Sequence, residues 1–235
     1  IIVSPMSLVS EVIGALRNNR AYEVFIQEDN NKVSMFTMRE ILKASDISNM
    51  RVSSLMFYVT KLSPDETVGR AARLMSDYRL RALPVVKDGL MDGAVTAQSL
   101  CQSLLSAKDL GDLAVNKIMK ADPITIGKGE SVLKARRLMV KNGIDHLPVL
   151  DSGELCGVLL SSHIVFSMAP KEGRGKAAFV SEPSGFLDLK ASGLMDSDVL
   201  VCDPKEKVVE VLRRMIEQDK TYSIVKMWHE VQGIV

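Results

Sequence analysis

The sequence is poor in the residues that build metal centres and disulfide scaffolds. Its 235 residues include three cysteines, at 101, 156 and 202, and three histidines, at 146, 163 and 229. The cysteines form no C-x-x-C pair and the histidines form no H-x-x-x-H pair, so neither a zinc motif nor a disulfide framework is present. We therefore expect reduced, buried thiols and no metal site.

The sequence also lacks an excess of charge and a long apolar run. Lys and Arg (30) nearly balance Asp and Glu (29), which gives no general attraction to nucleic acid or anionic lipid. Arginines cluster at 70, 73, 79 and 81, but acidic residues interleave with them and aromatics make up only 5%, so we expect no nucleic-acid partner. No window reaches about 18 apolar residues, and no secretory signal is present. We expect a cytoplasmic protein without membrane contact.

The two ends of the sequence do not resemble natural termini. The chain opens at Ile1, and its last residues, 232–235, have the character of the middle of a strand. We expect a fragment of a longer polypeptide. The apolar content of 46% is enough for a folded core.

An internal repeat dominates the sequence. Offsets of 59, 64 and 76 residues superimpose the first copy on the second, the second on the third and the third on the fourth. The landmarks shared by the last three copies are Val68, Val132 and Val208; Met75, Met139 and Met215; and Gly93, Gly157 and Gly233. Four copies of one unit of about 60 residues account for nearly the whole chain.

Each copy has the pattern of a β-α-β-β-α unit. In the second copy, an apolar strand at Tyr58–Leu62 precedes a helix start at Ser63–Glu66, where proline and acids suit the first turn. Two strands follow at Leu83–Val86 and Gly93–Thr96, joined by an Asp-Gly turn, and a second helix covers Ala97–Leu105. A unit this small cannot bury both faces of its sheet, so we expect the copies to pair.

This pattern predicts an α/β protein of four paired repeats. The expected boundaries are motif 1 at 1–45, motif 2 at 46–107, motif 3 at 112–169, a linker at 170–190 and a truncated motif 4 at 191–235. The pairs would form two modules, 1–107 and 112–235, packed into a flat disc. A homodimer of such discs is the expected assembly.

The units resemble cystathionine-β-synthase (CBS) domains. The resemblance rests on Val52–Met56, Thr67–Met75, Leu83–Val86 and Gly93–Thr96, and on their counterparts in the third copy. It covers nearly all of the chain outside the expected linker. It implies pairing into Bateman modules, as in archaeal stand-alone CBS proteins and, more distantly, in the gamma subunit of AMP-activated protein kinase. It also implies a non-catalytic regulatory role and adenosyl ligands (AMP, ADP, ATP or S-adenosylmethionine) in the clefts between paired motifs.

The resemblance carries over several ligand-binding residues. In the family pattern, the third strand ends in Gly-apolar-apolar-Ser/Thr-x-x-Asp, where the hydroxyl meets phosphate and the acid holds ribose. The first copy offers Thr37 and Glu40 at these positions, and the second offers Thr96 but no acid. The third copy has Leu160 and His163 instead. No copy therefore keeps the full pair in its usual form.

Three further positions complete the candidate site set. Arg81 stands just ahead of a second strand, where similar proteins place a phosphate-binding cation, and His146 lies one position later in its own copy. Thr125 lies in a first strand, at a position that often contacts the adenosyl group. The six candidate residues are thus Thr37, Glu40, Arg81, Thr96, Thr125 and His146.

The same residues also have purely structural explanations. The threonines can cap helices, Glu40 can favour a helix dipole, and Arg81 can pair with Asp77. We therefore keep two hypotheses, an adenosyl-binding regulatory module that acts on a protein partner and an assembly scaffold whose clefts have decayed. No Ser-His-Asp set or G-x-G-x-x-G loop is present, so we expect neither an enzyme nor a required cofactor.

Overall fold

The computed structural model describes residues 1–28, 32–44, 46–105, 111–168 and 188–235, and the chain divides into two compact units. The first unit holds residues 1–100 and the end of the helix from Val165, and the second holds residues 101–164 and the described residues from 188 onward. The predicted motif boundaries stay predictions, and most of the predicted linker at 170–190 lies outside the described residues.

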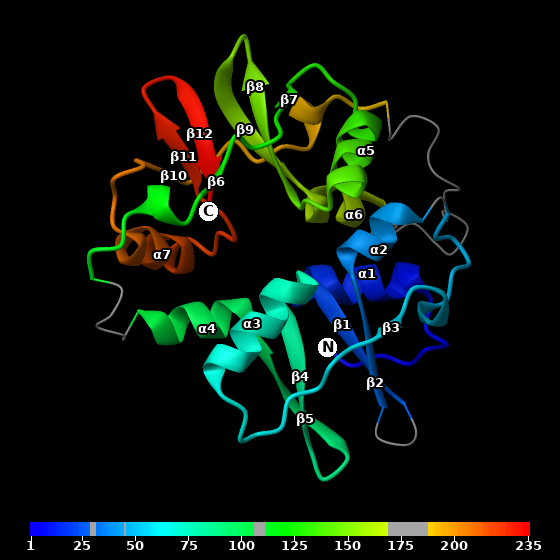
Figure 1. Ribbon diagram of the computed structural model, residues 1–235. Coiled ribbons are helices and arrows are strands. Elements are labelled where there is room, and N and C mark those ends of the chain that lie inside the picture. Colours follow the sequence, from blue (N-terminus) through cyan, green and yellow to red (C-terminus); the bar gives the residue numbers. More distant parts are fainter. Residues whose placement is uncertain (29–31, 45, 106–110, 169–187) are drawn as a thin grey trace. The chain divides into compact units, whose positions relative to one another are not determined.

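The first unit contains two antiparallel hairpins (Figure 1). In the first repeat, β1 (Glu23–Glu28) pairs with β2 (Lys32–Thr37), and the short β3 (Phe57–Tyr58) pairs with the other edge of β2. In the second repeat, β4 (Ala82–Lys87) pairs with β5 (Leu90–Thr96). The helices of these two repeats are α1 (Val9–Asn18), α2 (Met38–Lys43), α3 (Val68–Tyr78) and α4 (Ala97–Leu104).

The second unit repeats this arrangement (Figure 1). In the third repeat, β7 (Ile126–Gly127) runs parallel to β8 (His146–Asp151), which pairs with β9 (Glu154–Leu160). The fourth repeat contributes a sheet in the order β10-β11-β12-β6, with bounds Val201–Cys202, Ile224–Met227, Glu230–Ile234 and Lys120–Ala121. The helices are α5 (Val132–Asn142), α6 (Ser161–Met168) and α7 (Val208–Glu217).

The first helix of each repeat packs its apolar stripe on the sheet. In the second repeat, α3 buries Ala71 and Met75 against Leu62 and Leu83, which come from the first and second strands. In the fourth repeat, Val211 of α7 packs in the same way with Val225 and the free thiol of Cys202. Burial of these side chains supplies the apolar driving force that holds each repeat together. The predicted α/β fold of repeated units is confirmed.

The local helix signals differ from those predicted. Residues 63–66 form a turn, and α3 begins only at Val68, where the Thr67 side chain accepts a hydrogen bond from the backbone N–H of Arg70. The predicted start at Ser63–Glu66 is therefore wrong, because the capping hydroxyl and not the proline sets the helix boundary. The predicted first strand at Tyr58–Leu62 is also shorter than expected, because β3 ends at Tyr58 and pairs with β2 of the first repeat, and Leu62 forms only an isolated parallel bridge with Val85.

Candidate functional site

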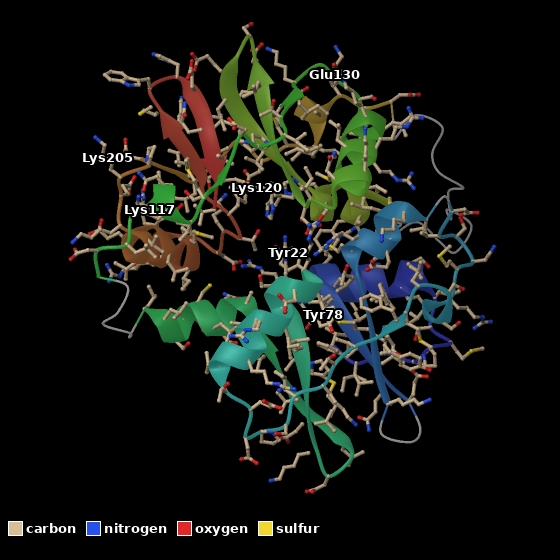
Figure 2. The ribbon with its side chains drawn as sticks, viewed as in Figure 1. Tyr22, Tyr78, Lys117, Lys120, Glu130 and Lys205 are labelled. Atoms are coloured by element: carbon tan, nitrogen blue, oxygen red, sulfur yellow. The ribbon has the colours of Figure 1, made fainter. Side chains whose placement is uncertain are left out.

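A pocket lies where the first and second repeats meet within the first unit. Its volume is about 310 Å³, which is at the lower end of the range typical of small-molecule sites. Aromatic side chains form a large part of the wall, and Tyr78 stands at the end of α3 (Figure 2). The lining residues are Thr37, Arg39, Glu40, Phe57, Tyr58, Val59, Thr60, Tyr78 and Leu80. We call this the first pocket.

Two predicted ligand residues, Thr37 and Glu40, meet at the polar side of the first pocket. Thr37 is buried and ends β2, so its hydroxyl caps α2 by accepting a hydrogen bond of 3.2 Å from the N–H of Arg39. Oε2 of Glu40 accepts from the Thr37 N–H at 2.9 Å and from the Thr37 hydroxyl at 2.6 Å. Oε1 of Glu40 lies 3.5 Å from Nζ of Lys43, which is exposed. The reciprocal bonds form a capping box, so the structural explanation of both residues is realised here.

Arg39 is a lining residue that sequence reasoning missed. It lies between Thr37 and Glu40 in the chain, and its guanidinium donates a hydrogen bond to the carbonyl oxygen of Arg79. Arg79 ends α3 in the left-handed conformation with φ 54°, which turns the chain beside the pocket. Arg39 is the one cationic side chain among the residues that line the first pocket. Its position in the sequence, two residues after the capping Thr37, was the signal from which Arg39 could have been predicted.

A second, smaller pocket lies where the third and fourth repeats meet. Its volume is about 230 Å³. His146 lines it from the start of β8, where its Nε2 lies 3.1 Å from the Thr221 hydroxyl oxygen and its ring centroid lies 5.3 Å from that of Tyr222. The other lining residues are Lys120, Pro123, Ile124, Ile144, Asp145, Ile234 and Val235. We call this the second pocket.

Charged side chains occupy the position in the second unit that corresponds to the first pocket. The repeat offsets make Lys220 and His163 the equivalents of Leu80 and Glu40. Asp196 follows Met195 as Phe57 follows Met56, so these two residues are also equivalent once one inserted residue is allowed for. Nζ of Lys220 lies 2.9 Å from Oδ2 of Asp196, and the Lys220 side chain is only 12% exposed. Burial lowers the pKa of His163, whose Nδ1 accepts a 3.4 Å hydrogen bond from the backbone N–H of Leu160. An internal ion pair thus stands where the first unit has an aromatic pocket.

The remaining candidates lie outside the linings of both pockets. The Arg81 guanidinium stacks on the Tyr22 ring, with 4.8 Å between its central carbon and the ring centroid. Thr96 and Ser99 exchange two backbone-to-hydroxyl hydrogen bonds of 3.0 Å each, which cap α4. Thr125 is half-buried beside Ile124. The structure therefore brings Thr37 and Glu40 together and places Arg81, Thr96, Thr125 and His146 elsewhere, so a ligand role for any of the six stays a prediction.

The described residues contain neither a cluster of metal-ligating side chains nor a membrane-spanning helix. Within the described ranges, no three His, Cys, Asp or Glu side chains gather closely enough to hold a metal ion. The helices in the same parts of the chain are all too short or too polar to cross a bilayer.

Three β-α-β-β-α repeats and a fourth that extends to its third strand are paired so that a pocket lies between the two members of each pair, which defines a tandem-repeat α/β protein. The CBS domain family matches this chain twice, at residues 52–106 and 115–169. The chain is therefore a tandem CBS-domain protein, as the sequence motifs predicted.

Comparison with known proteins extends the likeness to nearly the full length. An uncharacterized protein of Methanocaldococcus jannaschii, MJ1404, is 27% identical over 239 residues, which cover 99% of this chain and 56% of that protein. Inosine-5'-monophosphate dehydrogenase of Korarchaeum cryptofilum is 28% identical over 230 residues, covering 93% of this chain and 46% of the enzyme. The chain thus spans about half the length of these two relatives.

Solved structures show the same fold. The crystal structure of MJ1225 from M. jannaschii, a proposed archaeal homolog of g-AMPK, matches with a TM-score of 0.87 and 19% identity, over 100% of this chain and 92% of that one. An uncharacterized conserved protein from Pyrococcus horikoshii matches with a TM-score of 0.65 and 16% identity, over 91% and 87% of the two chains. Identities this low show the fold alone.

Proposed function

We propose that the chain is a non-catalytic regulatory module that binds an adenosyl ligand in the first pocket. The observation that carries this proposal is the composition of the pocket wall, in which aromatic rings stand beside a hydroxyl, a carboxylate and a guanidinium. Aromatic faces suit a purine ring, a carboxylate accepts hydrogen bonds from a ribose diol, and a guanidinium fits phosphate oxygens.

The charge of the wall favours a phosphate-bearing ligand. Arg39 would attract AMP, ADP or ATP and would repel the sulfonium centre of S-adenosylmethionine. We therefore place adenine nucleotides ahead of S-adenosylmethionine as the ligand of this pocket.

Glu40 retains capacity for a ribose despite its capping role. An ionised carboxylate has about four acceptor positions. Oε2 is used by Thr37, whereas Oε1 has a 3.5 Å contact with the exposed Lys43. A ribose diol would bond to Oε1 and displace the ammonium of Lys43, while the capping box at Thr37 stays closed.

Regulation would arise from differential affinity. A ligand shifts an equilibrium between two arrangements of a protein only if it binds one of them more tightly. The first pocket joins two repeats, so a bound nucleotide would favour the arrangement in which α2 and the β3 segment approach each other. A protein partner, or another part of the full-length polypeptide, would respond to that change of arrangement.

Thermal unfolding with separate additions of AMP, ADP, ATP and S-adenosylmethionine at millimolar concentration tests the proposal. A ligand at about 100 times its dissociation constant stabilises the fold by about 2.7 kcal/mol, which is easily measured. We expect a rise in Tm with a nucleotide, a loss of that rise in Arg39→Ala, and its retention in Arg73→Ala, which changes an exposed arginine outside the pocket. Arg81→Ala tests whether Arg81, the other candidate cation, contributes to nucleotide binding. Absence of a shift with all four compounds would reject the proposal.

A second candidate function is an assembly scaffold that works by dimerisation. It is favoured by the Lys220–Asp196 ion pair, which fills the corresponding position of the second unit with the protein's own charges. A scaffold would show a constant Tm with every ligand and a dimer mass by light scattering. A monomer mass together with a nucleotide shift would reject the scaffold.

A further inference from the structure

The second helix of the first, second and third repeats begins with the same hydrogen bond. The backbone N–H of the residue directly ahead of the helix donates to the side chain of the third helical residue. This bond ties the start of the helix to the end of the preceding strand. The three donor and acceptor pairs are Thr37 with Glu40, Thr96 with Ser99, and Leu160 with His163, at 2.9, 3.0 and 3.4 Å.

The third repeat depends on this bond more than the other two do. In the first two repeats the residue ahead of the helix is a threonine, and its hydroxyl accepts a hydrogen bond in return. These return bonds come from the N–H of Arg39 at 3.2 Å and from the N–H of Ser99 at 3.0 Å. Leu160 stands at this position in the third repeat and has no hydroxyl. The cap of α6 in the described part of the chain therefore rests on the ring of His163.

His163 can accept this bond only while its ring is neutral. A neutral imidazole accepts at one nitrogen and donates from the other, whereas the protonated ring donates from both. The backbone carbonyl of Leu194 accepts a hydrogen bond from the same ring. Protonation would set an N–H of the ring against the N–H of Leu160. It would also place a cation at the N-terminus of α6, where the helix dipole disfavours it.

The protonated ring has a second partner nearby. Two charged side chains act on His163: the carboxylate of Asp196 favours its protonation and the ammonium of Lys220 opposes it. Lys220 lies 2.9 Å from Oδ2 of Asp196 and 3.1 Å from Oδ2 of Asp198. Two carboxylates thus share one ammonium, which leaves an excess of one negative charge that protonation of His163 cancels. Asp196 can pair with the protonated ring while Lys220 retains Asp198.

We propose that His163 is a proton-sensitive switch that exchanges one partner for another. The neutral ring caps α6 at Leu160, and the protonated ring leaves the cap and pairs with Asp196. The position of His163 corresponds to that of Glu40 in the first pocket. The second unit would therefore respond to protons at the position where the first unit offers a carboxylate to a ligand. The switch needs no bound nucleotide, so its test is independent of the proposed function.

The switch should act in mildly acidic solution. Burial lowers the pKa of His163, Asp196 and the Leu194 carbonyl partly oppose this, and Lys220 adds to it. A histidine with a lowered pKa in the folded state weakens the fold as the pH falls below its ordinary value of 6.5. Asp196 stays ionised in this range because its own pKa is lowered below 3.8. The exchange of partners should therefore be visible between about pH 7.5 and about pH 5.

Nuclear magnetic resonance of the chain over this pH range tests the proposal. The ring nitrogens of His163 report its protonation, and hydrogen exchange of the Leu160 amide reports the cap. We expect the protection factor of this amide to fall about tenfold as the ring becomes protonated. In His163→Gln the side-chain oxygen accepts the same bond at every pH, so the protection factor should stay constant. His229→Gln is the matched control, because His229 is an exposed histidine that pairs with Glu154, and this variant should behave like the unsubstituted chain.

Asp196→Asn tests the second partner. The substitution keeps the two backbone hydrogen bonds of 2.9 Å between residue 196 and Val158, but it removes the charge that pairs with the protonated ring. The midpoint of the His163 titration and the midpoint of the loss of protection at Leu160 should both move to lower pH.

Three outcomes would overturn the proposal. The first is a constant protection factor at Leu160 while the ring of His163 titrates. The second is a loss of protection that persists in His163→Gln, because another group would then cause it. The third is a His163 titration whose midpoint stays in place in Asp196→Asn, because Asp196 would then not be the partner of the protonated ring.

Discussion

The guanidinium of Arg81 stacks on the ring of Tyr22, and the two residues occupy the same position in consecutive repeats, 59 residues apart. The second unit has the same relationship one position further along the repeat. There the rings of His146 and Tyr222, 76 residues apart, lie 5.3 Å from each other. Each unit thus joins its two repeats by a contact between equivalent residues, and the chemistry of that contact has diverged between the units.

The Arg81–Tyr22 contact should stabilise the first unit through the face of the aromatic ring. A cation over an aromatic ring contributes about 0.5–1 kcal/mol at exposed sites. We expect Tyr22→Leu to lower the free energy of unfolding by about that amount, and Tyr22→Phe, which keeps the ring, to leave it nearly unchanged. Urea denaturation measures both. Equal losses in the two variants would show that the hydroxyl, and not the ring, carries the contact.

Glycine-to-alanine substitutions should change the stability of the fold in opposite directions at different positions. A Cβ added at Gly157 would lie 2.6 Å from Sδ of Met195, and one added at Gly233 would lie 2.8 Å from Sδ of Met119, each beside a backbone carbonyl oxygen. Gly157→Ala and Gly233→Ala should therefore each lower the free energy of unfolding by about 1–3 kcal/mol. Gly14 lies within α1 with no atom within 4 Å of an added Cβ, so Gly14→Ala should stabilise by about 0.5–1 kcal/mol through helix propensity. Thermal unfolding of the three variants checks the signs, and a stabilised Gly157→Ala would contradict this packing.

We expect Lys220 to make the largest polar contribution to the stability of the second unit. Burial alone would lower its pKa, but the hydrogen bonds to Asp196 and Asp198 outweigh burial and raise it. Lys220→Met should leave the partly buried carboxylate of Asp196 without its cation, at a cost of about 1–3 kcal/mol. Asp198→Asn should cost far less, because the Asp198 side chain is 86% exposed. Chemical denaturation distinguishes the two, and equal effects would reject the distinction.

The same ion pair predicts an acid-dependent loss of stability. Burial alone would raise the pKa of Asp196, but the hydrogen bonds from Lys220 and the Asp198 backbone lower it below the ordinary value of 3.8. A carboxyl group with a lowered pKa in the folded state stabilises the fold above its ordinary pKa, and that contribution is lost as the pH falls below about 4. The difference in stability between the wild type and Lys220→Met should therefore shrink in acid. A difference that stays constant to pH 3 would contradict this coupling.

The repeat could be predicted in detail because its signals are local and occur several times. Landmarks such as Val68, Val132 and Val208 predict the helices, and apolar strands on either side of turns that contain Asp, Asn or Gly predict the hairpins. The helix start at Val68 was misplaced because proline and acids ahead of it suggested an earlier boundary, whereas the Thr67 hydroxyl sets it. Capping depends on one side-chain bond that composition does not show.

The site was predictable only where it lies along one segment of chain. Thr37 and Glu40 are three residues apart and meet as their spacing suggests. Tyr58 and Tyr78 reach the same pocket from a different repeat, so their contribution depends on how the repeats pair. The Lys220–Asp196 pair likewise joins residues 24 apart whose charges gave no local signal. Sequence patterns define the repeat, and the pairing of repeats defines what fills each cleft.

Tyr222 should make the second unit sensitive to alkali. The residue is 1% exposed, and its hydroxyl has no hydrogen-bond partner among the residues that the structure describes. Burial raises the pKa of Tyr222 to about 12, because the rise from burial and from the charges of Asp196 and Asp198 outweighs the lowering by Lys220. The neutral hydroxyl is favoured in the fold, so stability from this group is complete below the ordinary pKa of about 10 and is lost as the pH rises toward 12.

Tyr222→Phe isolates this effect. Removal of a buried hydroxyl that bonds to none of the described residues should leave stability at pH 7 unchanged or raise it by up to about 1 kcal/mol, because a desolvated polar group is lost with no bond broken. Between pH 10 and the pKa of about 12, the variant should lose less stability than the wild type. Tyr78→Phe, which changes an exposed ring, is the matched control and should follow the wild-type curve. A Tyr222→Phe variant that is destabilised by more than about 1 kcal/mol at pH 7 would show that the hydroxyl has a bonding partner, because only a lost bond would then account for the cost.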